Sequence, residues 1–173
     1  MKDILVVIDM QNDFLTGALA NAEAETVITR VREKIASFKG EVIFTRDTHE
    51  GDYMNTREGK HLPVPHCIRG SRGWHITEEL ETAGRTVIDK PTFGSVYLAK
   101  MLSEKNERSP LSSVTLVGVC TDICVISNAM LIKAYLPELD VIVDASACAG
   151  VTRESHKNAL AAMRACQIII ENA

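Results

Sequence analysis

The chain alternates between short apolar runs and longer stretches in which apolar residues recur at helical spacing. Six short runs rich in β-branched residues predict buried strands at residues 3–8, 41–45, 86–89, 114–118, 139–143 and 167–171. Apolar residues three or four apart predict helices at residues 22–38, 75–82, 94–105, 123–135 and 153–165. Strands that alternate with helices are typical of a parallel sheet. We therefore expect an α/β fold, a six-stranded parallel sheet flanked by helices on both faces.

One segment, residues 46–74, interrupts this alternation. Arg, Asp, His, Gly, Pro and Asn dominate it, and its apolar residues show little periodicity. A loop of this length inside a compact domain is usually functional. Since 173 residues suit one domain and no linker divides the chain, we expect a single domain over residues 1–173, with residues 46–74 as a long loop that contributes to a site.

Charge and cysteine content narrow the possible partners. The net charge is −4 and no basic tract occurs, so we expect binding neither to nucleic acid nor to acidic membranes. The early apolar run at residues 4–8 is too short to cross a membrane and lacks the form of a signal peptide, which favours a cytoplasmic protein. Five cysteines at irregular spacing indicate reduced thiols rather than a disulfide framework.

Candidate chemistry begins with the segment GVCTDICV at residues 118–125, which predicts a tight turn between a buried strand and a helix. A thiol at such a turn, here Cys124, lies near the amides of a helix N-terminus. The helix dipole there favours thiolate over thiol, and the amides can hold an oxyanion. The segment can therefore supply both a nucleophile and a cradle for its tetrahedral intermediate.

Two further side chains, Asp9 and Lys90, each close a strand-like run, as Cys124 follows one. If the three runs are neighbouring parallel strands, the three groups emerge at the same carboxyl edge of the sheet. A carboxylate there can take the proton of a thiol, and an ammonium favours both ionised forms. Taken singly, a buried cysteine, an aspartate after a strand and a lysine before proline are all ordinary structural residues. Their coincidence at three strand ends predicts a nucleophilic site.

The long loop offers a second constellation. Asp47 and His49 follow a predicted strand, Glu58 comes later, and His66 is held in a stiff segment after Pro65. Two imidazoles with one or two carboxylates suit Zn²⁺, Fe²⁺ or Mn²⁺, although histidines in a polar loop can also be merely solvated. The three histidines His61, His75 and His156 are expected at the surface.

Three motifs together resemble the signatures of the isochorismatase-like cysteine hydrolases. They are IDMQNDF at residues 8–14, KPTFGS at residues 90–95 and GVCTDICV at residues 118–125, and the resemblance runs in order along essentially the whole chain. It implies a three-layer Rossmann-like domain and a triad of Asp9, Lys90 and Cys124. It also implies a cis peptide between Val119 and Cys120, and an oxyanion hole made of the backbone amides of Cys120 and Cys124.

Within this superfamily, residues 47–49 and 65–70 resemble the metal loop of the nicotinamidase/pyrazinamidase branch. The resemblance implies a divalent metal, zinc before iron or manganese, bound by Asp47, His49 and His66. Glu58 is the expected fourth ligand, since Tyr53 stands where some members carry another histidine. Two aromatic side chains, Phe14 and Tyr97, are the expected pocket walls, and Trp74 is a candidate replacement for a missing family tryptophan.

The resemblance implies hydrolysis of nicotinamide to nicotinate and ammonia through a thioester on Cys124. A sister activity on a small amide, carbamoyl or ureido substrate is the main rival. A non-enzymatic module that binds a small molecule, and a redox sensor that uses Cys120 and Cys124, are also compatible with the sequence. Family members often self-associate, so a homo-oligomer is expected.

Overall fold

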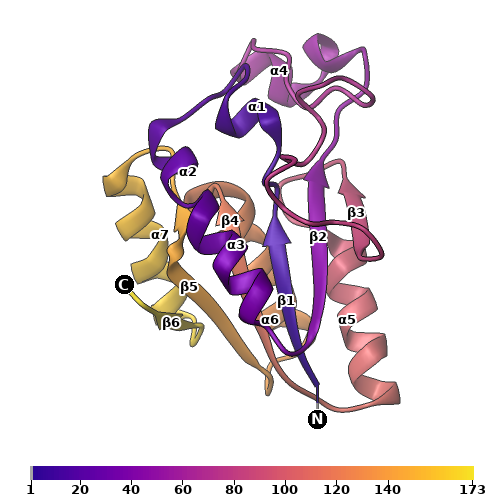
Figure 1. The fold of residues 1–173 in the computed structure, drawn as a ribbon, viewed down its shortest axis with the longest axis vertical. Helices are drawn as coiled ribbons and strands as arrows, with labels where there is room; N and C mark the ends of the chain where they lie inside the picture. The colour runs from indigo at the N-terminus through magenta and orange to yellow at the C-terminus, as the bar shows by residue number, and fades with distance from the viewer. Residues whose placement is uncertain (1) are drawn as a thin grey trace.

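The structure, a computed structural model, describes residues 2–173, so Met1 of the expected domain lies outside the described part. Its six strands form one all-parallel sheet in the order β3-β2-β1-β4-β5-β6, which confirms the predicted α/β architecture (Figure 1). The strands are β1 (Lys2–Ile8), β2 (Glu41–Asp47), β3 (Thr86–Lys90), β4 (Leu111–Val119), β5 (Asp140–Ala149) and β6 (Ile169–Glu171).

Helices cover both faces of this sheet. Alternate residues of β1 point to opposite sides, so Leu5 and Val7 join one apolar cluster while Ile4 and Val6 join the other. The first cluster is closed by α1 (Asn12–Leu15), α2 (Ala22–Thr26) and α3 (Ile28–Ser37), and the second by α5 (Val96–Arg108), α6 (Ile126–Tyr135) and α7 (Arg153–Ala165). The sheet is therefore buried on both sides, as the continuous apolar runs of its strands require.

The remaining short elements lie beyond the carboxyl ends of the strands. They are the 3₁₀ turn η1 (Tyr53–Asn55), helix α4 (Arg57–His61) and the π-helical turn η2 (Thr121–Val125), which leads into α6. Figure 1 shows α1, α4 and the segment between β2 and β3 gathered above this edge of the sheet, opposite the N-terminus. No helix within residues 2–173 has the length and apolar character needed to cross a membrane.

One helix prediction was wrong, and another was correct apart from a break. Residues 75–82 form no helix: Ile76 bridges to Gln11, and the Thr77 amide donates to the Met10 carbonyl, so Ile76 and Leu80 reach the apolar layer from irregular chain. The four-residue spacing of Ile76 and Leu80 is typical of a helix, but backbone pairing with Met10 and Gln11, just after β1, holds this segment in an irregular conformation. The helix expected over residues 22–38 is divided at Val27, after the Thr26 hydroxyl donates to the Glu23 carbonyl and offers the chain a local alternative to continued helix.

Candidate active site

Three buried side chains meet at the carboxyl edge of the sheet. Lys90 Nζ lies 2.7 Å from Asp9 Oδ2 and 3.4 Å from Cys124 Sγ, and the side chains of Asp9 and Lys90 are fully buried. The three runs are not all neighbours as the sequence suggested, because β2 separates β1 from β3. The lysine side chain is long enough to reach past β2, so the predicted convergence holds despite the intervening strand.

Local backbone geometry turns Asp9 into this site. Asp9 has a positive φ of 48°, and its Oδ1 accepts a 2.6 Å hydrogen bond from the Thr45 hydroxyl of β2. Burial raises the pKa of the Asp9 carboxyl, and Asp47 adds to this, while the Lys90 ammonium opposes it. The balance between burial and Lys90 was open from the sequence. A raised pKa makes the carboxylate a better acceptor for the proton of the neighbouring thiol.

The thiol is placed by an unusually tight turn after β4. Gly118 has a φ of +114°, and a Cβ there would collide with the Ile8 carbonyl oxygen, so the close approach to β1 requires glycine. The peptide between Val119 and Cys120 is cis, as the resemblance implied. The Cys120 carbonyl accepts hydrogen bonds from the amides of Ile123 and Val125, which curls the chain around the Cys124 side chain.

Burial decides the ionisation of this thiol. It raises the pKa of Cys124 well above the ordinary value, Asp9 raises it further, and only Lys90 works in the opposite direction. The net shift is thus toward the neutral thiol, whatever the helix N-terminus contributes in the opposite direction. A neutral thiol needs a base beside it, and Asp9 is in place to serve.

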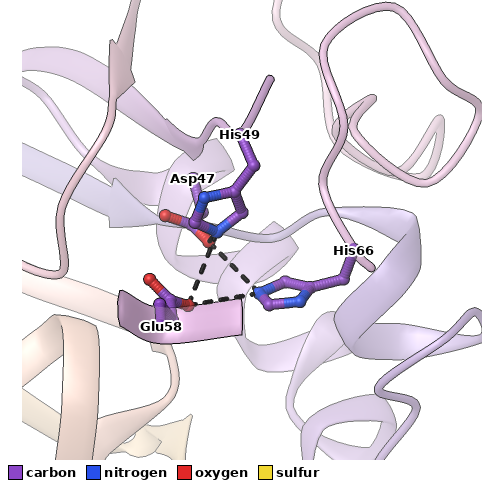
Figure 2. A group of neighbouring side chains, drawn as sticks. All are labelled: Asp47, His49, Glu58 and His66. Atoms are coloured by element: carbon purple, nitrogen blue, oxygen red, sulfur yellow. Dashed lines mark ion pairs between the residues drawn. The ribbon is translucent and has the colours of Figure 1, made fainter. Parts of the chain in front are cut away.

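A second group of side chains lies next to the first. Asp47 at the end of β2, His49, Glu58 on α4 and His66 offer ligand atoms that all lie within 4.8 Å of one another (Figure 2). The Nε2 atom of His49 is 3.0 Å from Asp47 Oδ2 and 3.5 Å from Glu58 Oε1. The His66 Nε2 atom is 3.6 Å from each of the same two oxygens. The structure thus brings together all four ligands expected from the sequence.

The donor set fits a divalent metal. His66 Nδ1 lies 2.8 Å from the Val64 carbonyl oxygen and donates to it, which leaves the lone pair of Nε2 directed at the group. The buried Nε2 of His49 has no partner of hydrogen-bond geometry among residues 2–173. Two imidazole nitrogens and two carboxylates are the ligands that zinc and similar metals take. Tyr53 is no ligand here, because its ring packs against both imidazoles and its hydroxyl donates to the Leu62 carbonyl.

Lys90 connects the two groups. Its Nζ also lies 3.2 Å from Asp47 Oδ1, so one ammonium contacts the carboxylate of each centre. Burial alone would raise the pKa of Asp47, but the adjacent imidazoles of His49 and His66, together with the Lys90 ammonium, hold it well below its usual range. Asp47 is therefore a carboxylate at neutral pH, as metal binding requires.

Both groups open onto one cavity of about 560 Å³. The cavity is lined by Cys120 and Cys124 of the turn after β4 and by three members of the candidate metal group. These members are Asp47, Glu58 and His66, and apolar walls come from Phe14, Leu62, Phe93 and Ile123. The expected pocket residue Phe14 is thus in place. Tyr97 is not: it is 66% exposed and does not line the cavity, because Phe93, four residues earlier and ahead of α5, fills that role. Trp74 lies outside the cavity wall as well, since its ring stacks under the Arg46 guanidinium at 3.6 Å.

Several site residues were missed or misjudged in the sequence. His61 is exposed as expected, yet it lines the cavity beside Arg57. His156 is not freely solvated, since its Nδ1 lies 2.8 Å from the Thr121 hydroxyl in the turn that carries the thiol. Gln11 and Asp13 were not predicted as site residues. Gln11 hydrogen-bonds to the backbone of Asp47 and Trp74, and Asp13 accepts from the Cys67 amide. Their place inside the motif IDMQNDF was the signal that could have found them.

Comparison with known proteins decides the family. The model of the isochorismatase family, described as the isochorismatase domain, matches residues 3–173. The chain belongs to the isochorismatase family. Its three motifs had predicted this membership.

Solved structures of similar proteins agree. A pyrazinamidase of Pyrococcus horikoshii in complex with zinc is 28% identical, with 98% of each chain covered and a TM-score of 0.83. The nicotinamidase/pyrazinamidase PncA of Bacillus subtilis is 25% identical, covering 99% of this chain and all of that one, with a TM-score of 0.79. An N-carbamoylsarcosine amidase from Thermoplasma acidophilum is 27% identical, covering 99% of this chain and 96% of that one, with a TM-score of 0.80. The chain is a hydrolase of this family, and its neighbours indicate the amide hydrolases.

Proposed function

We propose that this enzyme hydrolyses nicotinamide to nicotinate and ammonia through a thioester on Cys124. The observation that carries the proposal is the contact of one buried lysine, Lys90, with Asp9, Cys124 and Asp47. Through these contacts Lys90 lies between the proposed nucleophile and base, Cys124 and Asp9, and the proposed metal ligand Asp47. Similarity to a pyrazinamidase and to a nicotinamidase supports an amide on a small nitrogen-containing ring.

In the first half of the reaction, Asp9 takes the proton of the Cys124 thiol as sulfur attacks the amide carbon. A carbon–sulfur bond forms, and the π electron pair of the carbonyl moves to oxygen, which the amides of Cys120 and Cys124 hold. When the electron pair returns, the carbon–nitrogen bond breaks and Asp9 gives its proton to the departing ammonia. Lys90 keeps its positive charge, because Asp9, Cys124 and Asp47 together outweigh burial and raise its pKa.

In the second half, a water molecule replaces ammonia. Asp9 takes a proton from this water as its oxygen attacks the thioester carbon, the carbon–sulfur bond breaks, and the proton returns to the Cys124 sulfur. The apolar walls of the cavity keep other water away from the thioester. The enzyme is then ready for another substrate.

Asp47, His49, Glu58 and His66 would hold the metal, for which we propose zinc. When bound, the ion would supply a Lewis acid suited to a ring nitrogen of the substrate. The protein's own contribution is to orient the ring between Phe14 and Phe93, which both line the cavity. The amide carbon then faces the Cys124 sulfur.

A carbamoyl or ureido acid is the second candidate substrate. The cavity of about 560 Å³ has room for more than one ring, and Arg57 and His61 line it. A guanidinium there suits a carboxylate on the substrate. A redox role fits less well, because burial raises the pKa of Cys120 to about 12 and leaves that thiol unreactive at neutral pH.

We also propose that the enzyme acts in the cytoplasm and forms a homo-oligomer. Light scattering after size exclusion would test the oligomeric state.

Ammonia release from nicotinamide, pyrazinamide and N-carbamoylsarcosine, measured on zinc-loaded protein of known metal content, separates the candidates. We expect the highest kcat/KM for nicotinamide and no loss of this activity in Arg57→Gln. Preference for the carbamoyl acid, lost in Arg57→Gln, would replace the first candidate by the second. No ammonia from any of the three would overturn both.

A further inference from the structure

Gln11, two residues after the base Asp9, is fully buried, and its carboxamide makes three hydrogen bonds. Its Oε1 accepts from the Asp47 amide at 2.7 Å, and its Nε2 donates to the carbonyls of Asp47 at 2.8 Å and Trp74 at 2.9 Å. Both backbone groups of a metal ligand are therefore bound by one side chain. A glutamine amide can do this because it carries a donor and an acceptor side by side.

The sheet explains why Asp47 needs such a partner. The pairing of β1 with β2 runs only to Val7 and Phe44, and the chain leaves the sheet at Asp9, where φ is positive. Asp47 therefore extends beyond β1 on that side, while its neighbour on the opposite side is Lys90 of β3. The Gln11 carboxamide takes the position of the missing strand and satisfies backbone groups that would otherwise be buried without partners.

Asp13 likewise binds backbone next to the two histidines of the metal group. Its Oδ2 accepts a 2.7 Å hydrogen bond from the amide of Cys67, the residue that follows His66. The carbonyl of Cys67 in turn accepts a 3.0 Å hydrogen bond from the His49 amide. Space around the carboxylate is tight, since a Cβ on Gly73 would collide with Asp13 Oδ2. One carboxylate thus fixes the backbone between the two histidines.

From these contacts we propose that Gln11 and Asp13 are positioning residues for the metal. They act on Asp47 and on the backbone shared by His49 and His66, from the same short segment that supplies the base. The distance between the base and the metal is thereby set within residues 9–13 rather than by the packing of the whole loop. The inference rests on the metal site of the proposed function.

The test is zinc affinity of the metal-stripped protein, measured by competition with a chromophoric chelator. Gln11→Met keeps the volume but loses all three hydrogen bonds. Asp13→Asn replaces one of two carboxylate acceptors, which face the amides of Cys67 and Ala18, by a donor, so the two bonds can no longer both form. We expect each to weaken zinc binding by about 10–100-fold per folded molecule, the usual effect of removing a group that orients a ligand. The folded fraction is determined by circular dichroism on the same samples.

Asn12 supplies a matched control from the same segment. Its Nδ2 donates to the Arg72 carbonyl, a loop residue that is not a ligand. Asn12→Asp removes this bond, and we expect zinc affinity within about twofold of wild type, because the bond leads to no residue of the metal group and changes away from such contacts have small effects.

Each outcome bears on a different claim. Wild-type zinc affinity in folded Gln11→Met and Asp13→Asn would overturn the proposal, and so would equal losses in all three variants, which would indicate a general effect of the segment. A wild-type protein that binds no zinc would overturn both the metal site and this inference. A wild-type protein that binds zinc in a manner sensitive to Gln11 and Asp13, but releases no ammonia, would overturn only the proposed reaction.

Discussion

At the scale of single residues, the proposed reaction depends on Cys124. Its thiol is nearly fully buried in the turn after β4 and touches Lys90. We expect Cys124→Ala to abolish ammonia release, because no thioester can form, and to leave the fold and zinc content unchanged. Activity assays with far-ultraviolet circular dichroism check this. Ammonia release by the alanine variant above the level of a heat-denatured sample would refute the nucleophile.

Lys90 should also stabilise the fold, because it pairs with buried carboxylates. It is a cation that contacts both Asp9 and Asp47. Lys90→Met therefore leaves the buried Asp9 without its ionic partner, while Asp47 keeps the imidazoles of His49 and His66. Breaking a buried pair in this way costs about 3–5 kcal/mol, and we expect a loss of that order in urea unfolding together with loss of activity. Asp9→Asn is the matched control, since it removes activity but relieves the site of a charge. A stable but inactive Lys90→Met would contradict the structural part.

At the scale of elements, Gly118 allows the end of β4 to approach β1. An added Cβ would meet the Ile8 carbonyl, and a φ of +114° is unsuited to residues with a side chain. We expect Gly118→Ala to lower the free energy of unfolding by about 2–4 kcal/mol, through backbone strain and overpacking, and to displace Asp9 from Cys124. Gly51→Ala, where the added Cβ meets nothing within 4 Å, is the control and should unfold like wild type. Equal stability of the two variants would disprove the requirement.

A partly buried ion pair joins α3 to β5. Lys34 Nζ lies 2.8 Å from Asp144 Oδ2. Burial alone would raise the pKa of Asp144, but hydrogen bonds from Lys34, Asn172 and Ser146 lower it below the ordinary 3.8. A lowered carboxyl pKa stabilises the fold above pH 3.8, and this contribution disappears as the pH falls through the folded-state value.

Asp144→Asn tests this sign. At pH 7 we expect the variant to be less stable than wild type by about 1 kcal/mol, the usual worth of such a contact. The difference should shrink as the pH falls from 3.8 through the lower folded-state pKa, below which the wild-type carboxyl is neutral as well. Urea unfolding at a series of pH values measures it. A difference that grows on acidification would show that Asp144 acts otherwise than through its charge.

At the scale of the whole molecule, the metal should stabilise the fold. An ion that binds only the folded chain adds about 2.7 kcal/mol at 100 times its Kd, which corresponds to a Tm higher by about 5–10 °C for a chain of this size. We expect chelation to reverse this shift and His49→Ala to lack it, because that variant loses an imidazole of the metal group. Differential scanning calorimetry with and without zinc makes the comparison. A zinc-dependent Tm in His49→Ala would locate the metal elsewhere.

The six parallel strands and most residues of the candidate site could be predicted from the sequence for a physical reason, although the strand order could not. Parallel strands bring their carboxyl ends together, so polar residues that close apolar runs, such as Asp9 and Lys90, are placed by the fold itself. The loop is different, because Gln11 and Asp13 act through backbone groups of distant residues that leave no trace in periodicity. The prediction for Tyr97 was wrong for a similar reason. The residue at which α5 begins decides whether Phe93 or Tyr97 faces the cavity, and the spacing of apolar residues does not fix that start.

The order of the strands has a consequence for the making of the protein. A ribosome delivers β1 first, yet β1 lies at the centre of the sheet and its second neighbour, β4, follows only after more than half of the chain. Asp9 is thus synthesised early, and Cys124 follows much later. Until β4 pairs and its turn closes, a nascent polypeptide holds no poised nucleophile. The candidate site can therefore form only after most of the sheet has assembled.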